Sequence, residues 1–314
     1  MLTGFMHLMS AIGSAAFYLP LIAVLYWCVD PRLAARLTVI LSLSSVVNTV
    51  LKLVFHDPRP YWTDPSVKGH EPIESFGMPS GHAQNAVAVW GFLATRARRA
   101  LWPAPLLVIV LIGVSRVQLG VHSAGQVMVG WAIGAGLLAA ALVLEPKVVP
   151  WWAARPLPLQ IAMALAVSLV PLGVAWVAVH SLQDWTWPQA WADAIVRAGG
   201  DTRPIDLEQA AAATGGLFGL VSGVCLLASR GWFDPGGTRG RRLARLPVGA
   251  AGAAVLALPD LFIGGHPFAI FVVQASLGLW STFGAPEAFV RLGLAERAPR
   301  PAARAGEGRT AGRQ

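Results

Sequence analysis

Long apolar runs alternate with short polar segments along most of the 314-residue chain. A transmembrane helix needs about 20 consecutive, mostly apolar residues to cross a bilayer. Runs that approach or reach this length have approximate ranges of 8–29, 34–55, 82–97, 100–118, 121–144, 158–180, 207–228, 246–264 and 267–286. The third run is short and begins with a polar turn. The pattern predicts an all-α, polytopic transmembrane helix bundle with about nine spans.

The composition agrees with this pattern, because 55% of the residues are hydrophobic, 13% are charged and the mean hydropathy is +0.58. A soluble domain would carry about 25% charged residues. The net charge of +8 could indicate nucleic acid, but no basic and aromatic motif accompanies it. Arginines flanking apolar runs are typical of contacts with anionic lipid. We therefore expect membrane lipids, and no nucleic acid, as partners. Cys28 and Cys225 lie in or beside apolar runs, where we expect small packing residues.

The basic residues also predict an orientation. Most of the lysines and arginines fall in loops that nine spans would place on one side of the membrane. These residues are Arg32, Arg36, Arg96, Arg98, Arg99, Lys147, Arg155, Arg230, Arg239, Arg241, Arg242, Arg245, Arg291, Arg297, Arg300, Arg304, Arg309 and Arg313. The positive-inside rule makes that side cytoplasmic, so the N-terminus is predicted outside and the C-terminus inside. Lys52, Arg59 and Arg116 lie on the other side near membrane depth, where charges mark functional sites.

The first polar cluster follows the second apolar run. Lys52 lies in the last turns of the expected helix, and Pro58 and Pro60 end it and hold Arg59 in a rigid turn. Arginine offers a bidentate fork and lysine a point charge, a combination that suits a tetrahedral oxyanion. The alternative for a lone lysine here is an interfacial anchor. We assign neighbouring His56 and Asp57 to local hydrogen bonding in the turn.

The second cluster, residues 78–85, opens directly into the third apolar run. Ser80 and Gly81 favour a helix start there, and Pro79 fixes the approach to it. A helix start presents free backbone N–H groups and a positive dipole end, which favour phosphate. His82 is expected in the first turn, beside any bound anion.

The third cluster joins the fourth and fifth runs and contains Arg116, His122 and Gln126. Residues four apart share one helix face, so Gln126 can accept the Nδ1–H of His122 and leave Nε2 with a free lone pair. That pairing of a nucleophile with an orienting group is typical of covalent catalysis. The alternative for a single interfacial histidine is a structural hydrogen bond. The predicted topology places all three clusters at external ends of spans.

Together these residues resemble the type 2 phosphatidic acid phosphatase superfamily, whose motifs are K-x6-R-P, P-S-G-H and S-R-x5-H-x3-D. The matching residues are Lys52, Arg59 and Pro60, then Pro79, Ser80, Gly81 and His82, then Ser115, Arg116 and His122. Gln126 stands where the superfamily usually has aspartate. Glutamine can set the imidazole tautomer but brings no charge to stabilise an imidazolium. Similar branches, including glucose-6-phosphatases and dolichyl-diphosphatases, carry glutamine there, so the resemblance still implies an active enzyme.

The resemblance implies catalytic roles for His122, His82 and Gln126. His122 would attack phosphorus and form a phosphohistidine, and His82 would protonate the leaving group and then activate water. Residues expected to hold the phosphoryl oxygens are Lys52, Arg59, Ser80, Gly81 and Arg116. Neither a metal nor another cofactor is expected.

We expect three segments, namely a five-span catalytic unit at 1–145, four further spans at 146–295 and a disordered cytoplasmic tail at 296–314. The N-terminus lacks the basic segment of a signal peptide, so the first run is expected to be a retained helix. Trp185, Trp187 and Trp191, after the sixth run, are typical of an interfacial aromatic belt, with a lid or lipid-guiding edge as the alternative.

The expected function is hydrolysis of a lipid phosphate or diphosphate at the extracytoplasmic face of a bacterial cell membrane. A first alternative is a glucose-6-phosphatase-like hydrolase of soluble phosphomonoesters, which the nine spans and Gln126 favour. Transfer of the phosphoryl group to an acceptor other than water is a second. A non-catalytic lipid-binding or transport protein that retains the pocket is a third. The sequence gives no signal for an oligomeric state.

Overall fold

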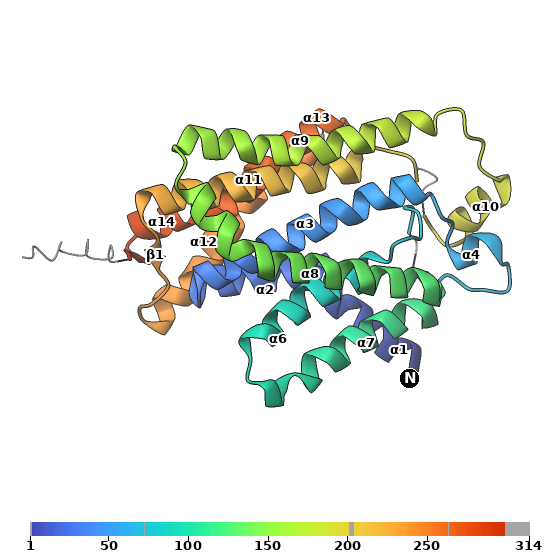
Figure 1. The fold of residues 1–314 in the computed structure, drawn as a ribbon, viewed down its shortest axis with the longest axis horizontal. Helices are drawn as coiled ribbons and strands as arrows, with labels where there is room; N and C mark the ends of the chain where they lie inside the picture. The colour runs from blue at the N-terminus through green and yellow to red at the C-terminus, as the bar shows by residue number, and fades with distance from the viewer. Residues whose placement is uncertain (1, 72, 201–203, 263, 299–314) are drawn as a thin grey trace, which may run out of the picture.

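The computed structural model describes residues 2–71, 73–200, 204–262 and 264–298, and nearly all of them belong to an elongated helical bundle (Figure 1). The helices of the first half are α1 (Leu2–Ile12), α2 (Ala15–Cys28), α3 (Pro31–Phe55), α4 (Pro60–Thr63), α5 (Gly81–Ala86), the π-helix η1 (Val87–Gly91), α6 (Phe92–Arg96), the 3₁₀-helix η2 (Arg99–Leu101), α7 (Pro103–Gln118) and α8 (Ala124–Ala153).

The second half is also helical, apart from one short strand pair. Its elements are α9 (Leu157–Ser181), α10 (Gln189–Arg197), α11 (Glu208–Arg230), β1 (Phe233–Asp234), α12 (Arg239–Ala257), the 3₁₀-helix η3 (Leu258–Leu261), α13 (Pro267–Leu279), the π-helix η4 (Trp280–Gly284), α14 (Ala285–Arg291) and β2 (Glu296–Arg297). β1 and β2 pair antiparallel, with Phe233 opposite Arg297.

The chain is an integral, multi-pass membrane protein, and the predicted all-α membrane bundle is confirmed. Within the described residues, seven helical segments are long and apolar enough to cross a membrane, and the pair α1 and α2, bent by 46°, makes an eighth candidate. The sequence predicted nine spans. The difference is the run 82–97, which forms α5, η1 and α6 with six, five and five residues. At 1.5 Å per residue this helix is shorter than a typical hydrocarbon core of about 30 Å, so it falls below the length of the other candidate spans.

Two groups of helices meet along α3. The segment from α5 to η1 packs against α3, α7 and α8, whereas α11 packs against α3, α9 and α13. The backbones of α11 and α13 approach so closely that a Cβ on Gly215 or Gly219 would collide with the α13 backbone. Small residues permit such close approach between membrane helices. The four long helices α3, α8, α9 and α11 therefore join both halves of the chain into one bundle (Figure 1).

Arg245 links four segments of the chain at the end of the bundle where β1 and β2 lie. Its guanidinium is fully buried and donates hydrogen bonds to backbone carbonyls. The acceptors are Trp27 at 2.8 Å, Pro235 at 2.7 Å, Gly236 at 2.6 Å and Leu294 at 2.7 Å. Glu296 and Arg297, which were expected to begin a disordered tail, form β2 instead. The rest of the expected tail, 299–314, lies outside the described residues.

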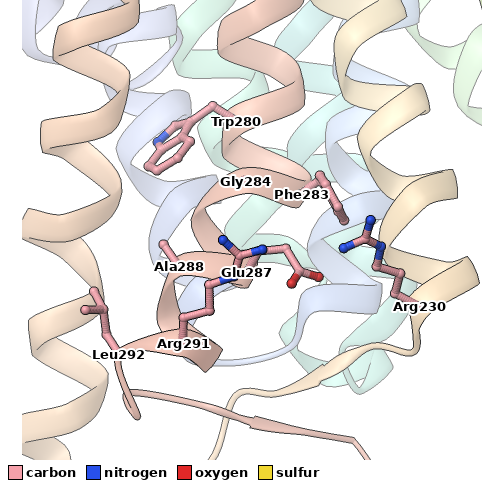
Figure 2. Close-up of a pocket in the computed structure, with 8 residues that line it drawn as sticks. All are labelled: Arg230, Trp280, Phe283, Gly284, Glu287, Ala288, Arg291 and Leu292. Atoms are coloured by element: carbon pink, nitrogen blue, oxygen red, sulfur yellow. The ribbon is translucent and has the colours of Figure 1, made fainter.

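A pocket of about 540 Å³ lies where α11 ends and η4 continues into α14. Figure 2 shows its lining, which comprises Arg230, Trp280, Phe283, Gly284, Glu287, Ala288, Arg291 and Leu292. None of the residues predicted to bind phosphate lies in this pocket. It is at the opposite end of the bundle from α4 and α10 (Figure 1).

Candidate active site

The three polar clusters meet at the end of the bundle that carries α4. The contributing segments are the last turn of α3, the turn into α4, the start of α5, the end of α7 and the start of α8 (Figure 1). The loop between α4 and α5 runs among them. Residues separated by up to 74 positions in the sequence, from Lys52 to Gln126, thus face a common site.

Arg59 is the most firmly fixed cation of the site. Its side chain is fully buried, and Pro60 begins α4 directly after it. Nε donates to the Ser75 carbonyl at 2.7 Å, Nη2 to the Phe76 carbonyl at 3.1 Å and Nη1 to the Val121 carbonyl at 2.9 Å. A guanidinium held at three corners by backbone has one orientation.

Ser75 links Arg59 to Lys52. Lys52 Nζ donates to Ser75 Oγ at 2.8 Å, and Arg59 Nη2 lies 3.3 Å from the same oxygen. The hydroxyl therefore holds both cations of the first motif side by side. Sequence reasoning missed Ser75, because it lies in a loop without periodicity and outside every motif.

Arg116 presents two buried hydrogen-bond donors to the site. Its side chain is fully buried, and Nη1 donates to Glu71 Oε2 at 2.7 Å and to Ser10 Oγ. Nε and Nη2 are buried without a hydrogen-bond partner among the described atoms. Buried donors without partners cost about 1–3 kcal/mol each. Two such donors on one cation indicate an anion as the natural occupant.

Ser80 adds a third group of this kind. It precedes α5 as the N-cap, is fully buried, and its Oγ has no partner among the described atoms. Its backbone N–H donates to the Gln126 carbonyl at 3.1 Å, which ties the start of α5 to α8. Gly81 follows, and a Cβ there would approach Asn48 Oδ1 to 2.9 Å. The small residue lets the helix start lie close to α3.

Glu71 is the acidic neighbour of this cationic site. Burial alone raises the pKa of the Glu71 carboxyl, but the Arg116 charge and hydrogen bonds from Arg116 and Ser10 outweigh it, so the pKa is lowered. Glu71 therefore stays ionised near neutral pH. It holds one end of the Arg116 guanidinium and leaves the other end free.

His122 lies between α7 and α8 and is 3% exposed. Its Nδ1 is 3.1 Å from Gln126 Oε1, and its Nε2 is 3.0 Å from Arg59 Nη1. A guanidinium can only donate, so Nε2 must carry the lone pair and Nδ1 the proton. Burial lowers the pKa of His122 well below its ordinary value, and the charges of Arg59, Arg116 and Lys52 act in the same direction. The ring therefore presents the lone pair of Nε2 to the cations.

Gln126 has a carboxylate partner that sequence reasoning did not foresee. Its Nε2 donates to Asp57 Oδ2 at 2.6 Å and to the Pro58 carbonyl at 2.8 Å. We expected Asp57 to hydrogen-bond locally within its own turn, but its side chain contacts a residue of α8. Only the juxtaposition of α8 with the turn after α3 produces this contact.

His82 lies in the first turn of α5, and the charges of Arg116, Lys52 and Arg59 act on it. Its ring packs at the break between α1 and α2, with Cδ2 3.3 Å from the position of a Cβ on Gly13. In the part of the chain that the structure describes, no hydrogen bond to its ring is formed.

The segment between α9 and α11 packs against α4 and the loop that follows it. Trp185 lies 6.2 Å from Phe76 between ring centroids, and Trp191 lies 6.0 Å from Trp62. The helix α10 also contacts α4. The second half of the chain therefore contributes aromatic contacts next to Arg59. No group of three or more His, Cys, Asp or Glu side chains that could hold a metal occurs among the described residues.

Comparison with known families gives two matches along the chain. Residues 33–150 match the PAP2 superfamily, and residues 211–297 match the transmembrane extension of PAP2 superfamily phosphatases. The first range includes every residue predicted to be catalytic or to bind phosphate.

Curated relatives include lipid phosphate phosphatase delta of Arabidopsis thaliana, 27% identical over 46% of this chain and 39% of the relative. Sphingosine-1-phosphate phosphatase 2 of Mus musculus is 30% identical over 41% of this chain and 39% of the relative. Phosphatidylglycerophosphatase B of Bacillus subtilis (strain 168) is 29% identical over 42% of this chain and 68% of the relative. The chain thus spans about two fifths of the length of the plant and mouse relatives. No solved structure matches it.

Proposed function

The chain belongs to the PAP2 superfamily, and from this premise we propose that it is a membrane phosphatase that hydrolyses a lipid phosphate or diphosphate. The observation that carries the proposal is the set of buried, unpartnered donors on Arg116 and Ser80 beside the oriented lone pair of His122. The donors can form hydrogen bonds to phosphoryl oxygens, and the lone pair can attack phosphorus. An anion that satisfied the donors would present its central atom to the nucleophile.

The first step forms a bond between His122 Nε2 and phosphorus and breaks the bond from phosphorus to the leaving oxygen. His82 gives its proton to that oxygen. Arg59 Nη1, which donates to Nε2 in this structure, keeps its orientation and donates to a phosphoryl oxygen when phosphate enters. Lys52, Arg116, Ser80 and the backbone N–H groups of Gly81 and His82 stabilise the charge on the other oxygens.

The second step releases phosphate from the phosphohistidine. His82, now neutral, takes a proton from water while the water oxygen attacks phosphorus and the P–N bond breaks. The net reaction consumes one water and yields an alcohol, or a monophosphate from a diphosphate, together with inorganic phosphate. Gln126 keeps the Nδ1–H of His122 in place throughout.

A lipid substrate is supported by the surface around the site. Val54 and Phe55, next to Lys52, are 45% and 42% exposed, and Val117, next to Arg116, is 39% exposed. Such apolar surface at the end of a membrane helix faces lipid. An acyl or isoprenyl chain can therefore stay in the membrane while its head group enters the site. The names of the relatives from Arabidopsis, mouse and Bacillus also refer to lipid phosphates.

We further propose a topology of nine spans, in which the short helix 81–96 crosses as the third. The N-terminus and the site would face outward and the C-terminus would be cytoplasmic. Supporting this, Arg32 lies over Trp232 and Arg230 over Phe283, so loops expected to be cytoplasmic lie together at the end away from Lys52. Residues 1–145 would form the catalytic unit, and 146–295 the extension that covers it.

The test measures phosphate release by the purified full-length protein in detergent with EDTA. Long-chain lipid monophosphates, isoprenyl diphosphates and sugar phosphates form the substrate arms. We expect turnover of a lipid arm, a trapped phosphohistidine, and loss of both in His122→Ala. Preference for sugar phosphates would favour the soluble-substrate alternative. Undiminished hydrolysis by His122→Ala would overturn the mechanism, and no hydrolysis of any substrate by the unmodified protein would overturn the enzymatic function.

A further inference from the structure

The Asp57 carboxylate has no direct role in the proposed reaction, but it contacts Gln126, which orients His122. Its Oδ2 accepts a hydrogen bond from Gln126 Nε2 at 2.6 Å, across 69 residues of sequence. Its backbone carbonyl accepts from the Gly77 N–H at 2.7 Å, an interaction that any residue at position 57 could make. The side-chain contact is therefore the feature that requires an acid or an amide here.

The hydrogen bonds around Gln126 fix the orientation of its carboxamide. Nε2 faces two acceptors, Asp57 Oδ2 and the Pro58 carbonyl, while Oε1 faces the Ser123 N–H at 3.2 Å. Reversing the amide would place its carbonyl against both acceptors and its NH₂ against a donor. Oε1 must therefore face His122 Nδ1, which agrees with the tautomer required by Arg59 on the other side of the ring.

The carboxamide also has little room to leave this position. Gln126 is 2% exposed, and the backbone of Gly77 lies so close that a Cβ there would collide with the carboxamide. The Gln126 backbone N–H donates to the Ser123 side chain in a capping box at the start of α8. The contact between Asp57 and Gln126 is therefore part of a packed unit.

We propose that Asp57 is a positioning residue for the reaction, whose negative charge supports His122 through the Gln126 carboxamide. This inference rests on the proposed function. The atoms form one chain from Asp57 Oδ2 through Nε2 and Oε1 of Gln126 to Nδ1 of His122. Hydrogen bonds in such a chain polarise one another, more strongly in a buried site.

The benefit arises when His122 attacks phosphorus. Its lone pair enters the new P–N bond, so positive charge develops on the ring and the Nδ1–H becomes a stronger donor. A carboxylate on the far side of the amide makes Oε1 a better acceptor at that moment. No proton travels along the chain, because the amide keeps both its hydrogens. Asp57 thus favours the charged phosphohistidine without touching the substrate.

The first test compares Asp57→Asn with the unmodified protein. Asparagine can keep a hydrogen bond to Gln126 and removes only the charge. We expect kcat to fall by about 10- to 100-fold, by analogy with the loss of the hydrogen-bond partner behind a metal-ligating histidine, with KM little changed. The acid limb of kcat/KM should move to lower pH, because a lost negative charge lowers the pKa of His122. The charges that act on the His122 ring, those of Arg59, Arg116 and Lys52, are the same in both proteins.

The control is Asp64→Asn, directly after α4. Asp64 is exposed, and its carboxylate accepts hydrogen bonds from Ser66 of its own turn, so its substitution should leave kcat and the pH profile unchanged. Unchanged kcat and an unchanged acid limb in Asp57→Asn would overturn the proposal.

A double variant that moves the carboxylate from position 57 to position 126 distinguishes a positioning role of Asp57 from a role in folding. Gln126→Glu places a second carboxylate against Asp57 and should lose activity, since two like charges cannot share this distance without a proton. Adding Asp57→Asn restores one negative and one neutral group, and the introduced asparagine amide can donate to the new carboxylate. We expect the double variant to exceed Gln126→Glu at least tenfold. If the double variant instead loses as much activity as the product of the two single-variant losses, the proposal is overturned. Thermal unfolding of each variant shows whether a loss of activity comes from a folding defect.

A measurement without turnover keeps this inference separate from the proposed function. Proteins labelled with ¹⁵N in histidine are titrated in detergent, and the His122 ring signals are identified by their loss in His122→Ala. If Asp57 acts through Gln126, the midpoint for His122 moves to lower pH in Asp57→Asn, even if no substrate has been found. An identical midpoint in both proteins would contradict the role of Asp57 whatever the reaction is.

Discussion

Nη1 of Arg59 lies 3.0 Å from Nε2 of His122 and donates to the lone pair that the proposed mechanism uses for attack. In the proposed mechanism, this hydrogen bond must be released before Nε2 can attack. An entering phosphoryl group offers the guanidinium a stronger, charged acceptor. In that mechanism, binding of the substrate and exposure of the Nε2 lone pair are the same event.

Arg59→Lys tests this coupling. Lysine keeps the charge but loses the hydrogen bonds to the carbonyls of Ser75, Phe76 and Val121 that fix the guanidinium. We expect kcat/KM for phosphate release to fall by about 100- to 1000-fold, the usual effect of losing one preorganised donor. Arg197→Lys, on the exposed end of α10, is the matched control. Activity within about threefold of the unmodified protein would show that Arg59 acts only through its charge.

The pH dependence follows from the lowered pKa of His122. The neutral imidazole persists as pH falls, so the acid limb of kcat/KM should lie below the ordinary histidine pKa of about 6.5. Lys52→Met removes one of the charges that lower this pKa. The acid limb should then move to higher pH, in addition to a loss of rate. Lys68→Met, at an exposed position, should leave it in place, and a shift to lower pH in Lys52→Met would contradict this electrostatic account.

Glu71→Gln tests whether Glu71 holds the guanidinium of Arg116 so that its Nε and Nη2 face the substrate. Glutamine can still accept from Arg116 and Ser10 but no longer neutralises the buried guanidinium, so the orientation of Nε and Nη2 is less well fixed. We expect kcat/KM to fall by about tenfold and inhibition by inorganic phosphate to weaken in parallel. Both are measured by initial rates, with Asp184→Asn, an exposed acid, for comparison. Tighter inhibition by phosphate would instead mean that Glu71 competes with the substrate for Arg116.

Arg245→Met tests the far end of the bundle. The substitution removes the donors for the carbonyls of Trp27, Pro235, Gly236 and Leu294. Since each buried unsatisfied group costs about 1–3 kcal/mol, the thermal unfolding midpoint should fall by several degrees. The rate per folded molecule should stay unchanged. The exposed Arg241→Met should have neither effect, and an unfolding midpoint unaffected by Arg245→Met would refute the fastening role.

Hydropathy and motif spacing were sufficient to predict the helical membrane bundle and the residues that meet at its end. Both depend on local sequence, because span length and helix-end chemistry are properties of short segments. The third run shows the limit of this approach. Its composition resembles a span, but its polar start at Ser80 and Gly81 makes the helix shorter than the other candidate spans.

Ser75, Glu71 and Asp57 could not be assigned their contacts in this way. Two of them lie in the loop between α4 and α5, whose path depends on its packing against Arg59 and Arg116. Asp57 meets Gln126 only because α8 returns beside the turn after α3. Polar contacts over such sequence distances follow from tertiary packing and leave no periodic pattern in the chain.

The hydrogen bonds of Arg245 have a consequence for the assembly of the protein during synthesis. The carbonyl of Trp27 is synthesised long before that of Leu294, and Arg245 binds both. During synthesis, the helices that precede Arg245 therefore lack this connection until the segment that follows α14 has been made. The two halves of the chain can be joined at this end of the bundle only at that late stage of insertion.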